Sequence, residues 1–88
     1  TMGQPPSHVY EQILKKNISV VAMPDSYELT FTQKPIYMEM YSTNGILFTK
    51  QTIDSYTLSI SRNQLINPYT IARVYFDNCT TETIKLIP

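Results

Sequence analysis

The residues best suited to binding a partner alternate along one short segment. Tyr37, Glu39 and Tyr41 occupy every second position there. Successive side chains of a β-strand point to opposite faces, so these three would project from the same face. A row of exposed tyrosines beside an acid is a surface that can grip a sugar or a peptide. We take Tyr37, Glu39 and Tyr41 as the candidate ligand or partner face. The alternative is that the rings shield the sheet or pack against the N-terminal segment.

Two residues could carry reactive chemistry, the single cysteine Cys79 and the single histidine His8. A nucleophilic thiol needs a neighbouring base, and a metal site needs three or four convergent ligands. His8 falls in the N-terminal segment, and the chain offers no second histidine or cysteine. We therefore predict no catalytic residue and no metal site. Cys79 is expected to be an incidental thiol in the last turn, without an intramolecular disulfide.

The carboxylates also have a structural explanation. Asp25, Asp54 and Asp77 each fall where a turn is predicted, and a short carboxylate commonly caps its own backbone there. No two of them have a spacing that suggests shared acid–base work. Gly3 and Gly45 are the only glycines, so the chain has no glycine-rich phosphate loop. The sequence therefore predicts a protein that is not an enzyme and uses no cofactor.

The length and charge exclude two classes of partner. At 88 residues and 10.2 kDa the chain is long enough for one small domain. Seven basic residues balance seven acidic ones, so the basic surplus that phosphate neutralisation requires is missing. The longest uninterrupted apolar stretch, 20–23, is far shorter than the roughly 20 residues that cross a bilayer. We predict no nucleic-acid partner and no membrane span.

The composition favours strands, because β-branched and aromatic residues suit a pleated surface. Alternation predicts strands at 27–32 and 56–61. The large side chains that alternation puts on their inner faces are Tyr27, Leu29 and Phe31 in the first and Tyr56, Leu58 and Ile60 in the second.

A hairpin is expected between these two strands. Segment 36–41 alternates, with Ile36, Met38 and Met40 opposite the tyrosine row. Asn44-Gly45 supplies residues that tolerate the positive φ of a tight turn, and an apolar run follows at once. We predict an antiparallel hairpin of 36–41 with 46–53. A second turn at 54–55 would lead into the strand at 56–61, as part of a meander of short strands.

The C-terminal third predicts two more strands. Segment 69–76 follows the break at Asn67-Pro68, but its alternation is imperfect, and a β-bulge at Ala72-Arg73 would bring both halves to the inner face. The large residues concerned are Tyr69, Ile71, Val74 and Phe76. Residues 62–66 are expected to cross over with Leu65 closing the core, 77–78 to turn, and 83–87 to form the last strand.

The N-terminal part is expected to begin with a flexible arm at 1–8. Segment 9–16 fits both a short helix and a strand, and we favour the strand. Segment 18–23 predicts a further strand closed by a turn at 24–26. Residues 9–88 would then form a single domain, an all-β antiparallel sandwich of about seven to eight short strands. Its unpaired edge strands could recruit a second copy, so a homodimer through an edge strand is a further expectation.

Several of these elements together resemble a known family. They are the apolar strand ending in Tyr41, the Asn44-Gly45 turn, the segments 56–60 and 69–74, and the closing strand 84–87. The pattern is similar to the small immunoglobulin-like (Ig-like) β-sandwich domains secreted by Bacteroidetes, which include domains of unknown function and the C-terminal sorting domains of type IX secretion cargo. The chain departs from it at Asn67-Pro68, where the family usually has a glycine before the tyrosine.

The resemblance implies an Ig-like sandwich and passage through a bacterial envelope. We therefore expect a non-catalytic accessory or interaction module located in the periplasm, at the cell surface or outside the cell, with an unidentified protein or glycan partner. Two alternatives stay open: a C-terminal sorting domain, and a carbohydrate- or peptide-binding module that uses the face of Tyr37, Glu39 and Tyr41.

Overall fold

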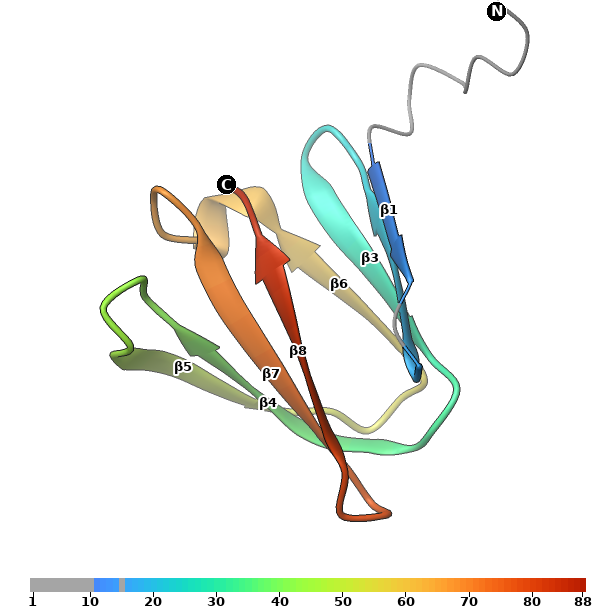
Figure 1. Ribbon diagram of the computed structural model, residues 1–88. Helices are drawn as coiled ribbons and strands as arrows, with labels where there is room; N and C mark the ends of the chain where they lie inside the picture. Colours follow the sequence, from blue (N-terminus) through green and yellow to red (C-terminus); the bar gives the residue numbers. More distant parts are fainter. Residues whose placement is uncertain (1–10, 15) are drawn as a thin grey trace, which may run out of the picture.

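The protein is an all-β sandwich of two antiparallel sheets (Figure 1). The computed structural model describes residues 11–14 and 16–88, with side chains from Lys16 onward. The predicted arm 1–8 and His8 lie outside the described residues. In sheet order the strands are β1 (Glu11–Leu14), β2 (Ile18–Ala22), β3 (Ser26–Phe31) and β6 (Thr57–Ser61) in the first sheet, and β5 (Leu47–Thr52), β4 (Pro35–Tyr41), β7 (Thr70–Phe76) and β8 (Thr81–Leu86) in the second.

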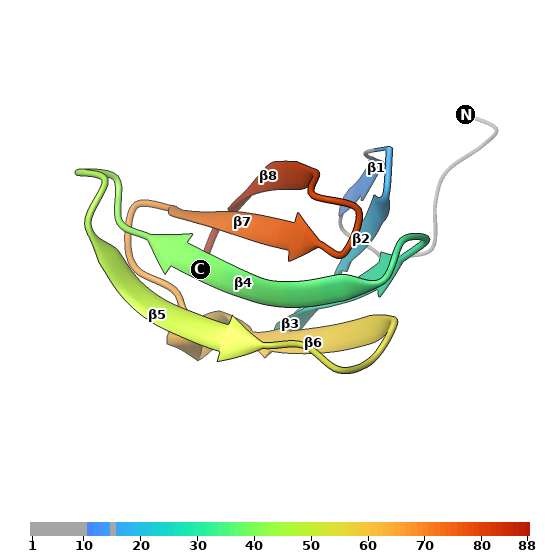
Figure 2. The ribbon, with the colours of Figure 1, turned by 90° about the horizontal axis from the view of Figure 1, so that it is seen from below.

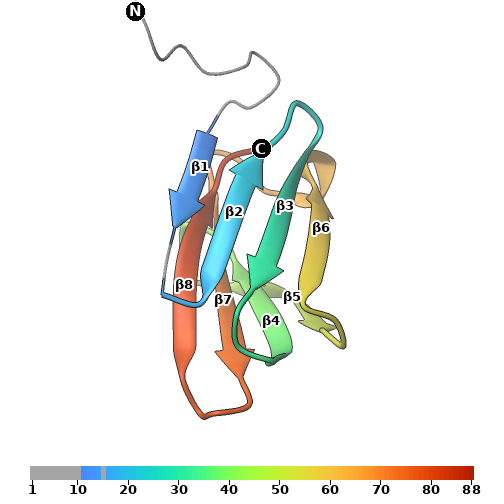
Figure 3. The same cartoon turned by 90° about the vertical axis from the view of Figure 1, so that its right-hand side faces the viewer.

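The core fills the space between the sheets, which lie one behind the other in Figure 3. The alternation predicted for 27–32 is confirmed, because Tyr27, Leu29 and Phe31 are buried. The ring of Phe31 in β3 meets that of Phe76 in β7 edge to face, with 6.1 Å between centroids. This is a favourable geometry for aromatic rings, and it joins the two layers directly.

The predicted hairpin is confirmed. Strand β4 pairs with β5 in antiparallel register, and Gly45 in the turn has φ +81°. Segment 11–14, within the range that fitted two templates, is a strand paired with β2. Leu65 closes the core behind a short 3₁₀ helix, η1 (Arg62–Gln64), as predicted for the crossing segment. The last strand begins at Thr81, two residues earlier than expected.

The predicted meander is wrong. After β5 the chain crosses to the other sheet, where β6 pairs with β3. Leu58 and Ile60 lie opposite Leu29 and Tyr27 in that ladder, so their apolar face joins the core from the first sheet. Alternation determines which face of a strand is buried, but it carries no information about the pairing partner. Tyr56, expected on the inner face, precedes β6 and is 52% exposed.

The predicted bulge at Ala72-Arg73 is also wrong. Strand β7 alternates regularly, with Thr70, Ala72, Val74 and Phe76 buried, so Tyr69 and Ile71 do not share the inner face with Val74 and Phe76. Large side chains were expected on the inner face of this strand, but Thr70 and Ala72 occupy two of its four inward positions. The hydroxyl of Thr70 accepts a hydrogen bond from the Ile66 N–H at 2.8 Å, which offsets its burial.

The irregularity lies in β4 instead. The register shifts between Pro35 and Tyr37, so Pro35 is buried while Ile36, predicted on the same face as Met38 and Met40, is 45% exposed. The shift leaves Tyr37, Glu39 and Tyr41 together on the outer face. Among the described residues no helix is long and apolar enough to cross a membrane. The outermost strands of the sheets are β1 and β6, and β5 and β8, and the homodimer through an edge strand stays a prediction.

Candidate functional site

The predicted row of Tyr37, Glu39 and Tyr41 lies on the outer face of the second sheet, on β4. Strands β5 and β7 flank β4, and Figure 2 shows the three side by side. Lys50 of β5 and Arg73 of β7 lie directly opposite Glu39, one on each side, and Tyr75 of β7 lies opposite Tyr37. We call these six residues the tyrosine face: Tyr37, Glu39, Tyr41, Lys50, Arg73 and Tyr75.

Glu39 organises this face. Its Oε1 accepts hydrogen bonds from the hydroxyls of Tyr41 at 2.6 Å and of Tyr75 at 2.8 Å. The rings of Tyr37 and Tyr75 pack against each other, with centroids 4.3 Å apart and planes 33° apart. All three tyrosines are half-buried. The Glu39 carboxylate therefore holds the phenols of Tyr41 and Tyr75 in place, and the Tyr75 ring packs against that of Tyr37.

Cations complete the arrangement. The Lys50 ammonium lies 4.4 Å from the centroid of the Tyr37 ring, and the Arg73 guanidinium lies 5.8 Å from that of Tyr41. Both side chains are exposed. A cation over the face of an aromatic ring is attracted by the electron density of the ring. The face therefore presents two ordered positive groups around a central carboxylate.

The hydrogen bonds change the acidity of both partners. The hydrogen bonds from Tyr41 and Tyr75 stabilise the ionised carboxylate, so the pKa of Glu39 lies below its ordinary value. Partial desolvation opposes this shift, and the positive charges of Lys50 and Arg73 add smaller contributions to it. The hydrogen bond to Glu39 raises the pKa of Tyr41 to about 12, because ionising Tyr41 would place two negative charges side by side. Partial burial, with Tyr75 and Glu39, raises the pKa of Tyr37.

Three members of the tyrosine face were not predicted. A turn closed by Ser42 and Ile46 would by itself place Thr49 opposite Glu39, and the register shift between Met40 and Tyr41 brings Lys50 there instead. Arg73 and Tyr75 arrive through the pairing of β4 with β7, across more than 30 residues of sequence, and no local pattern encodes that contact. The half-buried rings agree with both predicted roles of the row, a partner face and a shield of the sheet. The described part of the N-terminal segment, β1, belongs to the other sheet.

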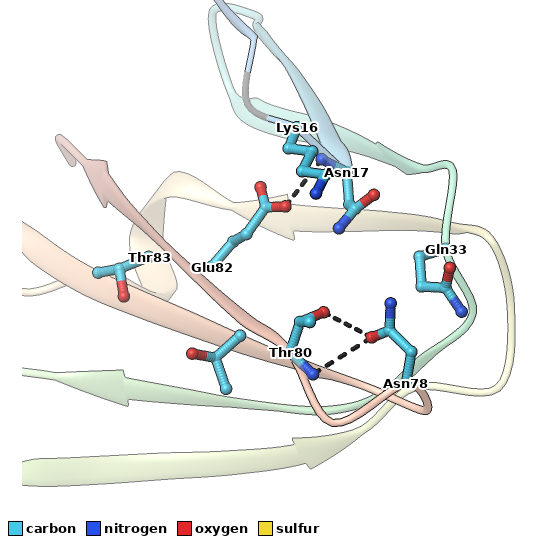
Figure 4. Close-up of a pocket in the computed structure, with 8 residues that line it drawn as sticks. Lys16, Asn17, Gln33, Asn78, Thr80, Glu82 and Thr83 are labelled. Carbon is cyan, nitrogen blue, oxygen red and sulfur yellow. Dashed lines mark hydrogen bonds between the residues drawn. The ribbon is translucent and has the colours of Figure 1, made fainter.

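A hollow lies at one end of the sandwich, and the sequence did not predict it. It measures about 550 Å³ (Figure 4). We call it the loop-end groove and define it by Lys16, Asn17, Gln33, Asn78, Thr80 and Glu82, to which two further threonines add. The residues come from the β1–β2, β3–β4 and β7–β8 connections and from β8. Each is an ordinary surface residue in the sequence, so only the fold brings them together.

The remaining candidates do not form a site. Cys79 lies in the last turn, as expected, and is exposed with φ +68°. Within the described part of the chain no three His, Cys, Asp or Glu side chains could hold a metal ion together. Asp25 and Asp54 are exposed in turns. The carboxylate of Asp77 accepts a hydrogen bond from the side chain of Gln33 in another connection.

Comparison with known proteins identifies no relative: no protein-family model, curated protein or solved structure matches the chain.

Proposed function

We propose that this protein is a non-catalytic interaction module with an Ig-like fold, which binds a protein partner through the tyrosine face. Ig-like sandwiches pair strands A, B and E in one sheet and C, F and G in the other, often with a C′ strand beside C. If β2 is taken as strand A, the observed orders β2-β3-β6 and β5-β4-β7-β8 match that arrangement, with β1 as an addition. This strand order supports the Ig-like assignment.

The observation that carries the proposal is the fixed geometry around Glu39. Binding costs free energy when flexible side chains must be ordered, and aromatic residues already held in place reduce that cost. Tyr41 and Tyr75 are held by the same carboxylate oxygen, and Tyr75 packs against Tyr37. Tyrosine and arginine are also the residue types enriched at the energetic centres of protein interfaces.

The geometry favours a protein over a sugar as the partner of this face. A sugar ring usually stacks on a free aromatic face. Lys50 covers the ring of Tyr37 from the β5 side and Tyr75 approaches it from the β7 side. The two exposed cations, Lys50 and Arg73, suit an acidic and aromatic protein surface.

The chemistry of Glu39 agrees with a binding role. A general acid must hold a proton near neutral pH, whereas the pKa of Glu39 is lowered by its two phenol donors. The resemblance to secreted Bacteroidetes domains supports a location in the periplasm, at the cell surface or outside the cell.

Site-specific photocrosslinking tests the proposal. Thr52 is exposed and lies opposite Tyr37 on β5, so a photoreactive amino acid at position 52 would report on the tyrosine face. Glu28, exposed on β3 of the other sheet, is the matched control position. With envelope and secreted proteins of the producing organism, we expect a discrete adduct from position 52 and none from position 28.

The second arm of the test uses variants of the face itself. Tyr37→Ala and Arg73→Ala should each abolish the adduct at position 52, while circular dichroism confirms that the variants fold. Identical adducts from positions 52 and 28, or an adduct insensitive to both variants, would contradict the proposal.

A further inference from the structure

We propose that the loop-end groove is a second binding site, for a neutral polyhydroxylated ligand of the size of a mono- or disaccharide. Backbone hydrogen bonds join the walls of the groove. The Thr32 N–H donates to the Asn17 carbonyl at 3.0 Å, and the Asp77 N–H donates to the Lys34 carbonyl at 3.0 Å. Backbone hydrogen bonds thus tie the three connections to one another, so the groove is formed before a ligand arrives.

The feature that points to a ligand is the carboxylate of Glu82. Its Oε2 accepts a hydrogen bond from the Asn17 N–H at 2.8 Å. Its Oε1 is buried, yet no described residue donates to it. A buried carboxylate oxygen without a donor is costly, and such atoms in native proteins usually mark a missing partner. Figure 4 shows this carboxylate on the groove wall beside Lys16, whose exposed side chain would have to move aside to admit a donor.

Two side-chain amides in the lining complement this acceptor with donors. The Oδ1 of Asn78 accepts hydrogen bonds from both the N–H and the hydroxyl of Thr80, which fixes the amide so that its NH₂ group faces the groove (Figure 4). The Oδ1 of Asn17 contacts the Thr32 hydroxyl at 3.3 Å, and its NH₂ group also points into the groove in Figure 4. Two donors thus border the hollow, that of Asn78 across from the Glu82 carboxylate and that of Asn17 beside it.

The charge and polarity of the lining select the class of ligand. Lys16 and Glu82 cancel, and the other lining residues are neutral amides and hydroxyls. Ligand pockets are usually mostly apolar, but among the described residues no aliphatic or aromatic side chain lines this one. Hydrogen bonds made in both directions would therefore determine which ligands the groove selects. Sugar hydroxyls both donate and accept, and a hollow of about 550 Å³ has room for one or two sugar rings.

Nuclear magnetic resonance titration of the ¹⁵N-labelled chain tests this inference. The probes are glucose, galactose, mannose, N-acetylglucosamine, cellobiose, maltose and lactose, each to about 20 mM, a range that detects millimolar affinity. We expect at least one probe to shift the backbone amides of Asn17, Asn78, Thr80 and Glu82, and to leave those of the tyrosine face unchanged. Failure at one site is thereby distinguishable from failure at the other.

Two nearly isosteric variants sharpen the test. Glu82→Gln keeps an oxygen for the Asn17 N–H but removes the charge, and Asn78→Asp keeps the acceptor for Thr80 but removes the NH₂ donor. Each should weaken binding about tenfold or more, the usual effect of losing a hydrogen bond that involves a charged group or its partner. Glu28→Gln makes the same charge change on the outer face of the first sheet and should leave the affinity unchanged.

Three results would overturn the inference. The first is that no probe in the panel shifts the groove amides. The second is that the affinity is the same in Glu82→Gln and Asn78→Asp. The third is that acetate or methylammonium shifts the groove amides at concentrations at which no sugar does, because that would assign the groove to a charged ligand.

Discussion

The buried Tyr27 and the tyrosine face both combine tyrosine with a charged side chain, and they use the combination differently. In the interior, Tyr27 is 2% exposed, and its hydroxyl donates to the Ile87 carbonyl and accepts from the Ile87 N–H and from Arg62. Arg62 stacks on the Tyr27 ring at 4.3 Å and also donates to the carbonyls of Met23 and Ile87. We call Tyr27, Arg62 and the backbone of Ile87 the clasp. The tyrosine face is its counterpart on the outside of the second sheet.

The difference lies in the partners. The side chain of Tyr27 in β3 and that of Arg62 bond to backbone groups of the β2–β3 connection and of the segment after β8, so the clasp closes the end of the core and ties both sheets together. The tyrosine face bonds only side chain to side chain, above strands that are already paired. Loss of the clasp should therefore cost stability, whereas loss of the tyrosine face should cost binding.

The largest effect is expected from removing a whole ring. Tyr27→Ala should destabilise the protein by about 4 kcal/mol, because it leaves a cavity in a packed core. Tyr37→Ala removes a half-buried ring at the surface and should cost about 1 kcal/mol. Urea denaturation of both variants measures the free energies of unfolding. Equal losses would show that the tyrosine face is a structural element.

Removal of a hydroxyl alone isolates the polar part of the comparison. Tyr27→Phe keeps the ring but leaves the Ile87 N–H without its acceptor, so we expect a loss of about 2 kcal/mol. The matched variant Tyr75→Phe removes a hydroxyl whose acceptor, Glu39, keeps Tyr41 as a donor, and should cost less than about 1 kcal/mol. The comparison fails if Tyr75→Phe costs as much as Tyr27→Phe in the same denaturation experiment.

The smallest effect concerns pH. The pKa of Tyr41 is raised to about 12, above its ordinary value of 10.0, so its contribution to stability is fully present below pH 10 and is lost as the pH rises through 12. The pKa of Glu39 is lowered, so its contribution is present above its ordinary pKa of 4.5 and is lost as the pH falls through the lowered value.

Titration of tyrosine ring carbons by nuclear magnetic resonance measures the pKa of Tyr41. In Glu39→Gln the phenol keeps an acceptor but loses the adjacent charge, so this pKa should fall towards 10. Glu28→Gln removes a carboxylate from the other sheet and should leave it unchanged. An unchanged titration of Tyr41 in Glu39→Gln would mean that Glu39 does not hold the phenol in solution.

Local patterns predicted much of this architecture. Alternation located most of the strands, and Asn44-Gly45 located the hairpin, because the direction of a side chain and the φ of a turn residue depend on neighbours in the chain. The same reasoning failed where small or polar residues face inward. In β7, Thr70 and Ala72 face the core. In β4, Pro35 is buried and Ile36 is exposed at the register shift.

The amino-acid order was therefore enough to establish an all-β chain and to place Tyr37, Glu39 and Tyr41 on one face. It could not establish that β6 joins β3, that Arg73 and Tyr75 come to lie beside Glu39, or that Asn17, Asn78 and Glu82 surround one hollow. Each of these contacts joins residues far apart in the chain. They form because the two sheets must share one core, and that requirement acts on the folded molecule as a whole.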